Sequence, residues 1–273
     1  MAAAAPSRVI VTRPAHEAAH WVRELAGHGI AAVALPLIAI GPCTEPAAIA
    51  ALQAARERAN RYRALMFVSG NAVAYFFDSK HPVALVAVGD EAIKTRAWAP
   101  GPATAQALAR AGVPLALIAG PAPDAPQFES EALWKQVGGQ LAPGDRVLIV
   151  RGQTGGLPES PQGTGRDWLA RQIEHAGASV DFVVAYQRVA PVWDAPDIAL
   201  ARQAAHDGSV WLLSSSEAVT HLAAVLPGQD WAHARALVTH PRIAEAARAA
   251  GFGHIGGCRP SLKDVVASIE SAA

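Results

Sequence analysis

The stretch VIVTRPAHEAAHWVRELAGHGIAAVALP, residues 9–36, decides the fold of this 273-residue chain. It has the pattern of a short apolar strand, an amphipathic helix and a second apolar strand. The same order returns about 140 residues later, as VLIVRG at 147–152 and WLARQIEHAGASVDFVV at 168–184. A long unit that is repeated once predicts two similar domains, because a solenoid needs shorter periods and at least three copies.

The two copies continue to match beyond this unit. FVSGNAV at 67–73 is echoed by LSSSEAV at 213–219, and PGPATAQALARAGV at 100–113 is echoed more faintly by HPRIAEAARAAGF at 240–252. Two like domains that face each other create a cleft, and ligands bind in clefts. The repeat therefore predicts a ligand site between two domains.

Short apolar runs alternate with helical patterns along the chain, which predicts parallel sheets covered by helices on both faces. The predicted strands are 8–12, 31–35, 64–68, 83–88, 115–118, 146–150, 180–185, 209–213, 235–238 and 254–256. The predicted helices are 15–27, 103–111, 129–138, 166–176, 216–225, 242–250 and 261–271. The glycines expected to end helices are Gly29, Gly112, Gly177 and Gly251. The proline-rich stretches 36–46 and 188–196 are interpreted as linkers.

The composition excludes several classes of partner. Hydrophobic residues make up 51% of the chain, and its 23 basic and 23 acidic residues cancel. No global field therefore attracts DNA, RNA or an anionic membrane surface, and an anionic ligand must be held by local groups. The N-terminus lacks a basic region followed by a long apolar stretch, and no run of about 18 apolar residues occurs. We expect no signal peptide, no membrane span and a cytoplasmic protein.

Neither the cysteines nor the histidines predict a metal site. Cys43 and Cys258 lack CxxC spacing, which favours two unpaired thiols. The letters HEAAH at 16–20 match the zinc motif HExxH. This match lies in the first turns of a predicted helix, has no third-ligand extension and has no counterpart in the second copy. We therefore expect a solvated helix start there, and no metal.

Polar residues at the carboxyl ends of the predicted strands are the candidates for function, because ligands of parallel α/β sheets bind there. They are Arg13, Ser69, Asn71, Thr104, Arg151, Gly152, Tyr186, Gln187, Arg188, Ser214, Ser215, Ser216, Thr239, His240 and Arg242. Hydroxyls, amides, guanidinium groups and helix N-termini together suit a ligand with several carboxylates or phosphates. Ser69 and Ser215 also stand where helix N-caps are expected.

Eight short motifs in this order resemble the uroporphyrinogen-III synthase family, from Val9 to the C-terminal helix. They are VTRP, F-x-S-x-N-A-V, AWAPGPATAQAL, FESEALW, VLIVRG, AYQR, SSSEAV and HPRIAEAARAAGF. The resemblance implies an α/β fold of two similar flavodoxin-like domains, each a parallel sheet flanked by helices, joined by a two-strand hinge. The implied boundaries are 1–38 plus 190–273 for domain one, 43–184 for the inserted domain two, and 39–42 and 185–189 for the linkers. The repeat alone suggests a tandem division near residue 140.

The resemblance also implies a reaction. The family cyclises hydroxymethylbilane, a linear tetrapyrrole, to uroporphyrinogen III with loss of water and inversion of the terminal D ring. No redox step is involved, so no cofactor is expected. The implied partner is this substrate with its multiple carboxylates. We expect no nucleic-acid or membrane partner, a monomer, and a transient contact with the preceding pathway enzyme.

Tyr186 is expected to be the catalytic proton or hydrogen-bond donor. It ends a predicted strand and matches the family's tyrosine, and a phenol with a pKa of about 10 stays protonated at neutral pH. The alternative for Tyr186 is packing alone, and the alternative for Thr104, which matches a family hydroxyl, is a first-turn residue. The substrate-binding roles of Asn71 and Gln187 are implied by the resemblance alone. The expected substrate-binding residues are Arg13, Ser69, Asn71, Thr104, Arg151, Gly152, Gln187, Arg188, Ser215, Ser216, Thr239 and Arg242.

The strongest alternative is a noncatalytic two-domain binding protein or sensor that closes on an anionic small molecule. It shares the duplicated domains and the hinge, but it would hold its ligand without converting it. The chain departs from the family at Ile243, where a threonine often stands, so no second hydroxyl is expected there.

Overall fold

The computed structural model describes residues 8–77, 95–121, 130–154 and 164–271, without the side chains of 164–167. The chain divides into two compact units. The first unit combines Met1–Ala39 with Val189–Ala273, and the second unit is Ile40–Arg188. Within the described ranges, no helix is long and apolar enough to cross a membrane.

The first unit is built on a parallel sheet with the strand order β11-β10-β9-β1-β2. Its strands are β1 (Val9–Val11), β2 (Ala32–Ala34), β9 (Val210–Leu213), β10 (Arg235–Val238) and β11 (His254–Gly257). Its helices are α1 (Ala15–Gly27), α7 (Ala195–Ala204), α8 (Ser216–Val225), α9 (Pro241–Ala249) and α10 (Leu262–Ser271).

Helices cover both faces of this first sheet. On one face, Val11 packs with Leu25 of α1 and Val265 of α10. On the other face, the buried indole of Trp211 donates its Nε1–H to the carbonyl oxygen of Ala204 in α7, at 3.2 Å. Successive residues of a strand point to opposite faces, so strands between two helical layers are apolar throughout.

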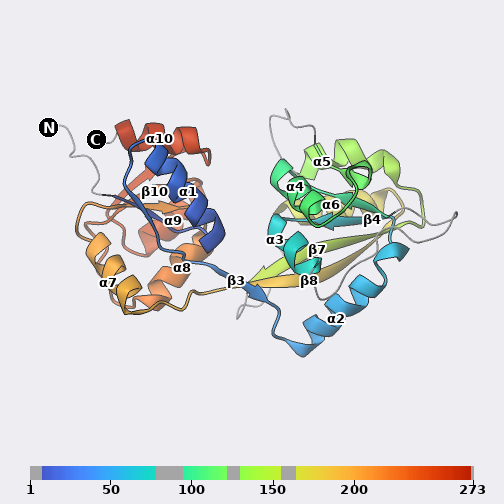
Figure 1. The fold of residues 1–273 in the computed structure, drawn as a ribbon, viewed down its shortest axis with the longest axis horizontal. Helices are drawn as coiled ribbons and strands as arrows, with labels where there is room; N and C mark the ends of the chain where they lie inside the picture. Colours follow the sequence, from blue (N-terminus) through green and yellow to red (C-terminus); the bar gives the residue numbers. More distant parts are fainter. Residues whose placement is uncertain (1–7, 78–94, 122–129, 155–163, 272–273) are drawn as a thin grey trace. The chain divides into compact units, whose positions relative to one another are not determined.

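The second unit is built on a sheet with the strand order β3-β8-β7-β4-β5-β6, in which β8 to β6 are parallel (Figure 1). Its strands are β3 (Ala39–Pro42), β4 (Ala64–Phe67), β5 (Arg96–Trp98), β6 (Ile118–Ala119), β7 (Arg146–Thr154) and β8 (Ser179–Val189). Its α-helices are α2 (Pro46–Glu57), α3 (Gly70–Phe76), α4 (Pro102–Arg110), α5 (Ser130–Val137) and α6 (Thr164–His175). Its 3-10 turns are η1 (Ala59–Arg61), η2 (Leu115–Leu117) and η3 (Gly138–Gln140).

The second sheet is also buried on both faces. Leu65 and Phe67 of β4 pack with side chains of α2, α3 and α4. Ala64 and Met66 of the same strand pack with side chains of α5 and α6. The predicted α/β fold with parallel sheets flanked by helices is therefore confirmed.

The internal repeat is visible in the strand order. The repeated sequence unit forms β1-α1-β2 in the first unit and β7-α6-β8 in the second. The shorter echo forms β9-α8 in the first unit and β4-α3 in the second. Matched in this way, β2-β1-β9-β10-β11 corresponds to β8-β7-β4-β5-β6, and the second sheet adds β3 beside β8. The four glycines expected to end helices all have positive φ, from 74° to 98°.

The proline-rich stretches are less irregular than predicted. Residues 39–42 form β3 and α2 starts at Pro46, since proline is accepted in a first helical turn. In the other stretch, β8 continues to Val189 and α7 starts at Ala195, after a capping box made by Asp194 and Asp197. The expected linkers 39–42 and 185–189 are thus strand residues.

The predicted strand 115–118 is mostly a 3-10 turn. In the predicted strand 115–118, η2 occupies 115–117, where Leu117 N–H bonds to the Pro114 carbonyl at 2.9 Å. Only Ile118–Ala119 pairs with β5, because this chain segment only touches the edge of the sheet. The predicted strand 83–88 lies outside the described residues. The elements α2, α3, α7 and β5 were not predicted.

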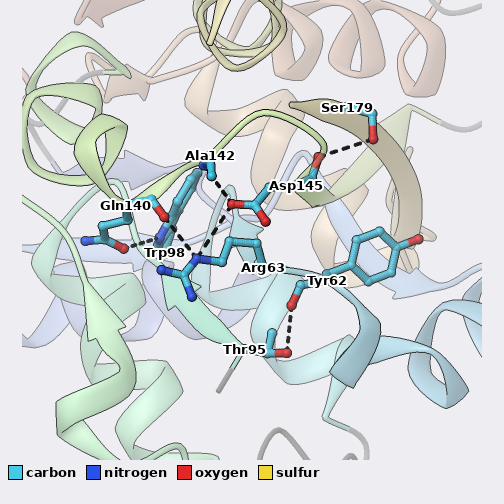
Figure 2. Close-up of polar contacts among 8 residues, drawn as sticks. All are labelled: Tyr62, Arg63, Thr95, Trp98, Gln140, Ala142, Asp145 and Ser179. Atoms are coloured by element: carbon cyan, nitrogen blue, oxygen red, sulfur yellow. Dashed lines mark hydrogen bonds and ion pairs between the residues drawn. The ribbon is translucent and has the colours of Figure 1, made fainter. Parts of the chain in front are cut away.

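Hydrogen bonds and one ion pair link residues at the amino ends of β4, β5, β7 and β8, together with Trp98 at the end of the short strand β5. Figure 2 shows its members: Tyr62, Arg63, Thr95, Trp98, Gln140, Ala142, Asp145 and Ser179. Arg63 Nε donates to the backbone oxygen of Gln140 at 2.9 Å and lies 3.8 Å from Asp145 Oδ2. The fully buried Thr95 hydroxyl lies 2.8 Å from the Tyr62 carbonyl oxygen. We call these eight residues the amino-edge network. Their polar groups form hydrogen bonds with backbone and side-chain groups of the same unit.

Candidate functional site

Four predicted site residues lie at the carboxyl edge of the second unit's sheet. Ser69 follows β4, Thr104 lies in the first turn of α4 after β5, Gly152 lies near the end of β7, and Tyr186 lies near the end of β8. The strands β8, β7, β4 and β5 are consecutive neighbours and run parallel. Their ends therefore bring these four residues to one side of the sheet, opposite the amino-edge network.

Tyr186 and Ser69 are in direct contact. Tyr186 is only 4% exposed, and its hydroxyl oxygen lies 3.2 Å from Ser69 Oγ, with either group able to donate. Ser69 Oγ also accepts the backbone N–H of Ala72 at 3.2 Å, so Ser69 is the N-cap of α3 as expected. The fold thus joins two residues that came from separate sequence motifs.

Gly152 leaves room for the Tyr186 ring. The two residues are paired across β7 and β8, next to a register shift between Arg151 and Gly152. A Cβ atom on Gly152 would lie 2.3 Å from Cζ of Tyr186 and 2.5 and 2.7 Å from its two Cε atoms. Any side chain here would displace the ring. Gly152, predicted to bind substrate, therefore has a steric reason to be glycine that is independent of substrate.

Tyr75 of α3 is a neighbour of Tyr186 that the sequence reasoning missed. The two rings are stacked, with centroids 5.9 Å apart and planes inclined by 27°. The Tyr75 hydroxyl donates to the carbonyl oxygen of Ile40 in β3 at 3.2 Å, and burial raises the pKa of this phenol. Tyr75 lies in the run AYFF, where it looks like one more core aromatic beside Phe76 and Phe77.

Thr104 and Asn71 lie in the first turns of two helices that pack together. Thr104 is 6% exposed, and its hydroxyl has no hydrogen bond within the part of the chain that the structure describes. Asn71 is half-buried in α3. The contact between α3 and α4 is close, because a Cβ atom on Gly70 would lie 3.7 Å from Cβ of Ala107. Both helix starts belong to the carboxyl edge.

The remaining polar candidates of the second unit already make contacts. The Arg151 guanidinium lies 5.0 Å from the Phe182 ring centroid. Gln187 Nε2 lies 3.5 Å from the Thr44 hydroxyl oxygen, and Arg188 donates to the Thr154 hydroxyl at 3.1 Å. Gln187 and Arg188 are therefore held along β8 by neighbouring hydroxyl groups.

In the first unit, the cap prediction for Ser215 is wrong in its detail. Ser215 occupies the N-cap position of α8, but its side chain makes no capping bond. At the next helix, His240 provides the cap, since its Nδ1 accepts the backbone N–H of Arg242 at 3.1 Å. Ser216 and Arg242 are exposed and Thr239 is half-buried. These residues follow β9 and β10 at the carboxyl edge of the first sheet.

Arg13 follows β1 and is engaged within α1. Its Nη1 lies 3.1 Å from a carboxylate oxygen of Glu17, and its guanidinium lies 4.5 Å from the ring centroid of Trp21. The HEAAH segment therefore uses Glu17 in an ion pair. His20 Nδ1 lies 3.8 Å from Glu24. The described residues contain no group of three or more His, Cys, Asp or Glu side chains that could hold a metal ion.

A hollow of about 560 Å³ lies elsewhere in the first unit, over β10, β11 and the end of α10. Arg235, His254 and Ser268 are among its lining residues. None of the predicted site residues lines this hollow.

Comparison with known proteins identifies the family. Residues 19–266 match the family model described as uroporphyrinogen-III synthase HemD, which is most of the chain. This chain belongs to the uroporphyrinogen-III synthase family. The resemblance inferred from the motifs is therefore confirmed.

Similar proteins are known both by sequence and by structure. A uroporphyrinogen-III synthase of Chlorobaculum parvum is 33% identical over 160 residues, which cover 55% of this chain and 56% of that protein. The alignment thus spans little more than half the length of this relative. The uroporphyrinogen-III synthetase structure from Helicobacter pylori is 14% identical with a TM-score of 0.54, covering 97% of this chain and all of that one. A mutant uroporphyrinogen III synthase from Thermus thermophilus gives 15% identity and a TM-score of 0.48, covering 97% and 98%.

Proposed function

We propose that this chain cyclises hydroxymethylbilane to uroporphyrinogen III, with loss of water and inversion of the D ring. The contact of Tyr186 with Ser69 at the carboxyl edge is the observation that carries the proposal beyond family membership. The bond from the terminal carbon to its hydroxyl breaks, and this hydroxyl takes up a proton and leaves as water. The terminal methylene carbon then bonds to the already substituted α-carbon of the D ring, and the bond from that α-carbon to the neighbouring methylene bridge breaks. This bridge bonds again to the free α-carbon of the D ring, which loses a proton, so the D ring is inverted and the net loss is one water.

Tyr186 assists the departure of the hydroxyl. Without substrate, its phenol shares a hydrogen bond with Ser69. A substrate hydroxyl that replaces Ser69 Oγ as the acceptor receives the phenolic hydrogen bond or proton. Hydrogen bonds of this kind often take their productive geometry only when substrate is bound. A positioned acid typically contributes about 100-fold to 10,000-fold.

Control of geometry is the second task. Once the hydroxyl has left, the reactive azafulvene can also close without inversion and give the type I isomer. The protein must therefore hold the linear tetrapyrrole so that the inverted attack is faster than the attack without inversion. This is catalysis by orientation. Fixed side chains serve this purpose better than mobile ones, and the buried, stacked ring of Tyr186 fits the requirement.

The substrate carboxylates need several donors. In the second unit, the start of α4 offers backbone N–H groups beside the Thr104 hydroxyl, and its N-cap Gly101 provides no side chain to occupy them. Arg151, Arg188, Asn71 and Gln187 extend this set along the same edge. The first-unit residues Arg13, Ser215, Ser216, Thr239 and Arg242 stay predictions, as do the cytoplasmic location, the monomer and the contact with a preceding enzyme.

The test supplies purified protein with freshly generated hydroxymethylbilane, with and without a chelator. The reaction is quenched within minutes, the products are oxidised to porphyrins, and the type I and type III isomers are separated by chromatography. We expect mainly type III in both samples. Only type I, formed at the rate of a protein-free control, would refute the proposal and favour the noncatalytic binding protein.

A further inference from the structure

The proposed proton donor is restrained by two neighbours that carry no acid or base function in the reaction. Gly152 lies against the Tyr186 ring without a side chain, and Tyr75 stacks on that ring. Tyr186 is also joined to Ser69 through its hydroxyl. Three contacts therefore act on one side chain: at its ring through Gly152 and Tyr75, and at its oxygen through Ser69.

Tyr75 is itself anchored. Its hydroxyl donates to the Ile40 carbonyl in β3, and β3 is the strand next to β8, which carries Tyr186. Tyr75 thus connects α3 to the edge strand and presents its ring to Tyr186 from a fixed point. A stacked aromatic pair contributes about 0.5–1.5 kcal/mol beyond the area it buries. That amount is enough to favour one orientation of a ring over its alternatives.

We propose that Tyr75 is a positioning residue that holds the Tyr186 phenol in its reactive orientation. This role rests on the proposed function, because it acts only through Tyr186. Ser69 is a weaker candidate for the same role, since its hydroxyl must give up Tyr186 when substrate binds. Tyr75 touches the ring rather than the hydroxyl, so its contact need not break when substrate binds.

A double-mutant cycle tests this role. Tyr75→Leu removes the ring but keeps an apolar side chain, and we expect it to lower kcat about tenfold with KM within about twofold. Tyr75→Phe restores the stacked ring and should recover most of kcat. In a Tyr186→Phe background, Tyr75→Leu should change kcat by less than about twofold, because the group that it positions is absent.

Outcomes of the cycle separate the two proposals. If the wild-type protein forms the type III isomer but Tyr75→Leu costs the same factor in both backgrounds, or nothing in either, only the positioning role is overturned. If the wild-type protein gives type I at the protein-free rate, the proposed function is overturned and the positioning role falls with it.

A second measurement does not depend on turnover. The chain has only three tyrosines, so labelling tyrosine with ¹³C at Cζ gives three resonances that single Tyr→Phe variants assign. In Tyr75→Leu, the Tyr186 resonance should shift or broaden while that of Tyr62, which lies at the amino edge, stays in place. An unchanged Tyr186 resonance would contradict the restraint that we propose.

Discussion

The two edges of the second unit's sheet use polar side chains differently. At the amino edge, Arg63 and Thr95 bond to backbone carbonyls, and Asp145 accepts a backbone N–H (Figure 2). At the carboxyl edge, Thr104 is also buried, with 6% exposed against 0% for Thr95, but its hydroxyl has no hydrogen bond among the described residues. Groups that are satisfied internally stabilise the fold, whereas buried groups with unused capacity are available to a ligand.

This difference predicts that the amino edge contributes mainly to stability and the carboxyl edge mainly to activity. Changes at the amino edge should lower the free energy of unfolding and leave turnover unchanged. Changes at the carboxyl edge should lower turnover by more than their effect on stability accounts for. The chain offers matched substitutions at both edges, in order of decreasing expected effect.

The largest effect is expected from Gly152→Ala. The added Cβ overlaps the Tyr186 ring, so we expect kcat to fall at least about 100-fold, with a loss of stability of about 1–3 kcal/mol. Gly139→Ala is the control, since Gly139 is exposed and its added Cβ meets nothing within 4 Å. Steady-state kinetics and urea unfolding measure both. Equal kinetics for the two variants would mean that the ring position is unimportant.

Tyr186→Phe removes only the phenolic oxygen. We expect kcat to fall about 100-fold, the low end for a positioned acid, with little change in KM. Stability should change by about 1 kcal/mol at most, since one hydrogen bond is lost. Tyr62→Phe makes the same change at the amino edge and should leave kcat unaltered. Loss of substrate binding in Tyr186→Phe would argue for a binding role instead.

Thr95→Val and Thr104→Val make the same change at the two edges. Thr95→Val leaves the buried Tyr62 carbonyl without this donor and should cost about 1–3 kcal/mol in unfolding experiments, with kcat maintained. Thr104→Val should change stability by less than about 0.5 kcal/mol but lower kcat/KM about tenfold. An equal loss of stability in both variants would contradict the proposed difference between the two edges.

The smallest effect compares the two serines of the repeat. Ser69→Ala removes a capping bond and should cost about 1 kcal/mol, whereas Ser215→Ala removes none and should cost less than about 0.5 kcal/mol. Thermal unfolding of the two variants measures this difference. A larger loss in Ser215→Ala would show that its hydroxyl stabilises the helix start by another route.

Much of the fold was predictable because strong periodicity marks long buried elements. The helix predicted at 15–27 is α1 with the same bounds, and the strand predicted at 235–238 is β10. Among the missed elements, α3 has seven residues and β5 has three, too few for a periodic pattern to emerge. Length does not explain the missed helices α2 and α7, which have 12 and 10 residues and follow stretches that were interpreted as linkers. The strand predicted at 115–118 failed because apolar content alone does not separate a strand from a turn at a sheet edge.

The candidate site was predictable only in part. Residues at strand ends could be named, since the carboxyl ends of parallel strands share one edge. Tyr75 could not be found, because stacking on Tyr186 depends on where α3 lies over β8 and leaves no mark in the run AYFF. Likewise, nothing in the sequence separates Ser69, whose side chain caps its helix, from Ser215, whose side chain does not.

The sequence by itself determined the α/β class, the internal repeat and the family, because periodicity, turn residues and ordered motifs are local properties of the chain. Only the tertiary structure decided which side chains share their surroundings. Gly152 and Tyr186 are 34 positions apart, yet pairing of β7 with β8 places the ring where a Cβ would be. Such contacts depend on strand register and on the close packing of helices over the sheet, and these are set by the whole fold rather than by any one segment.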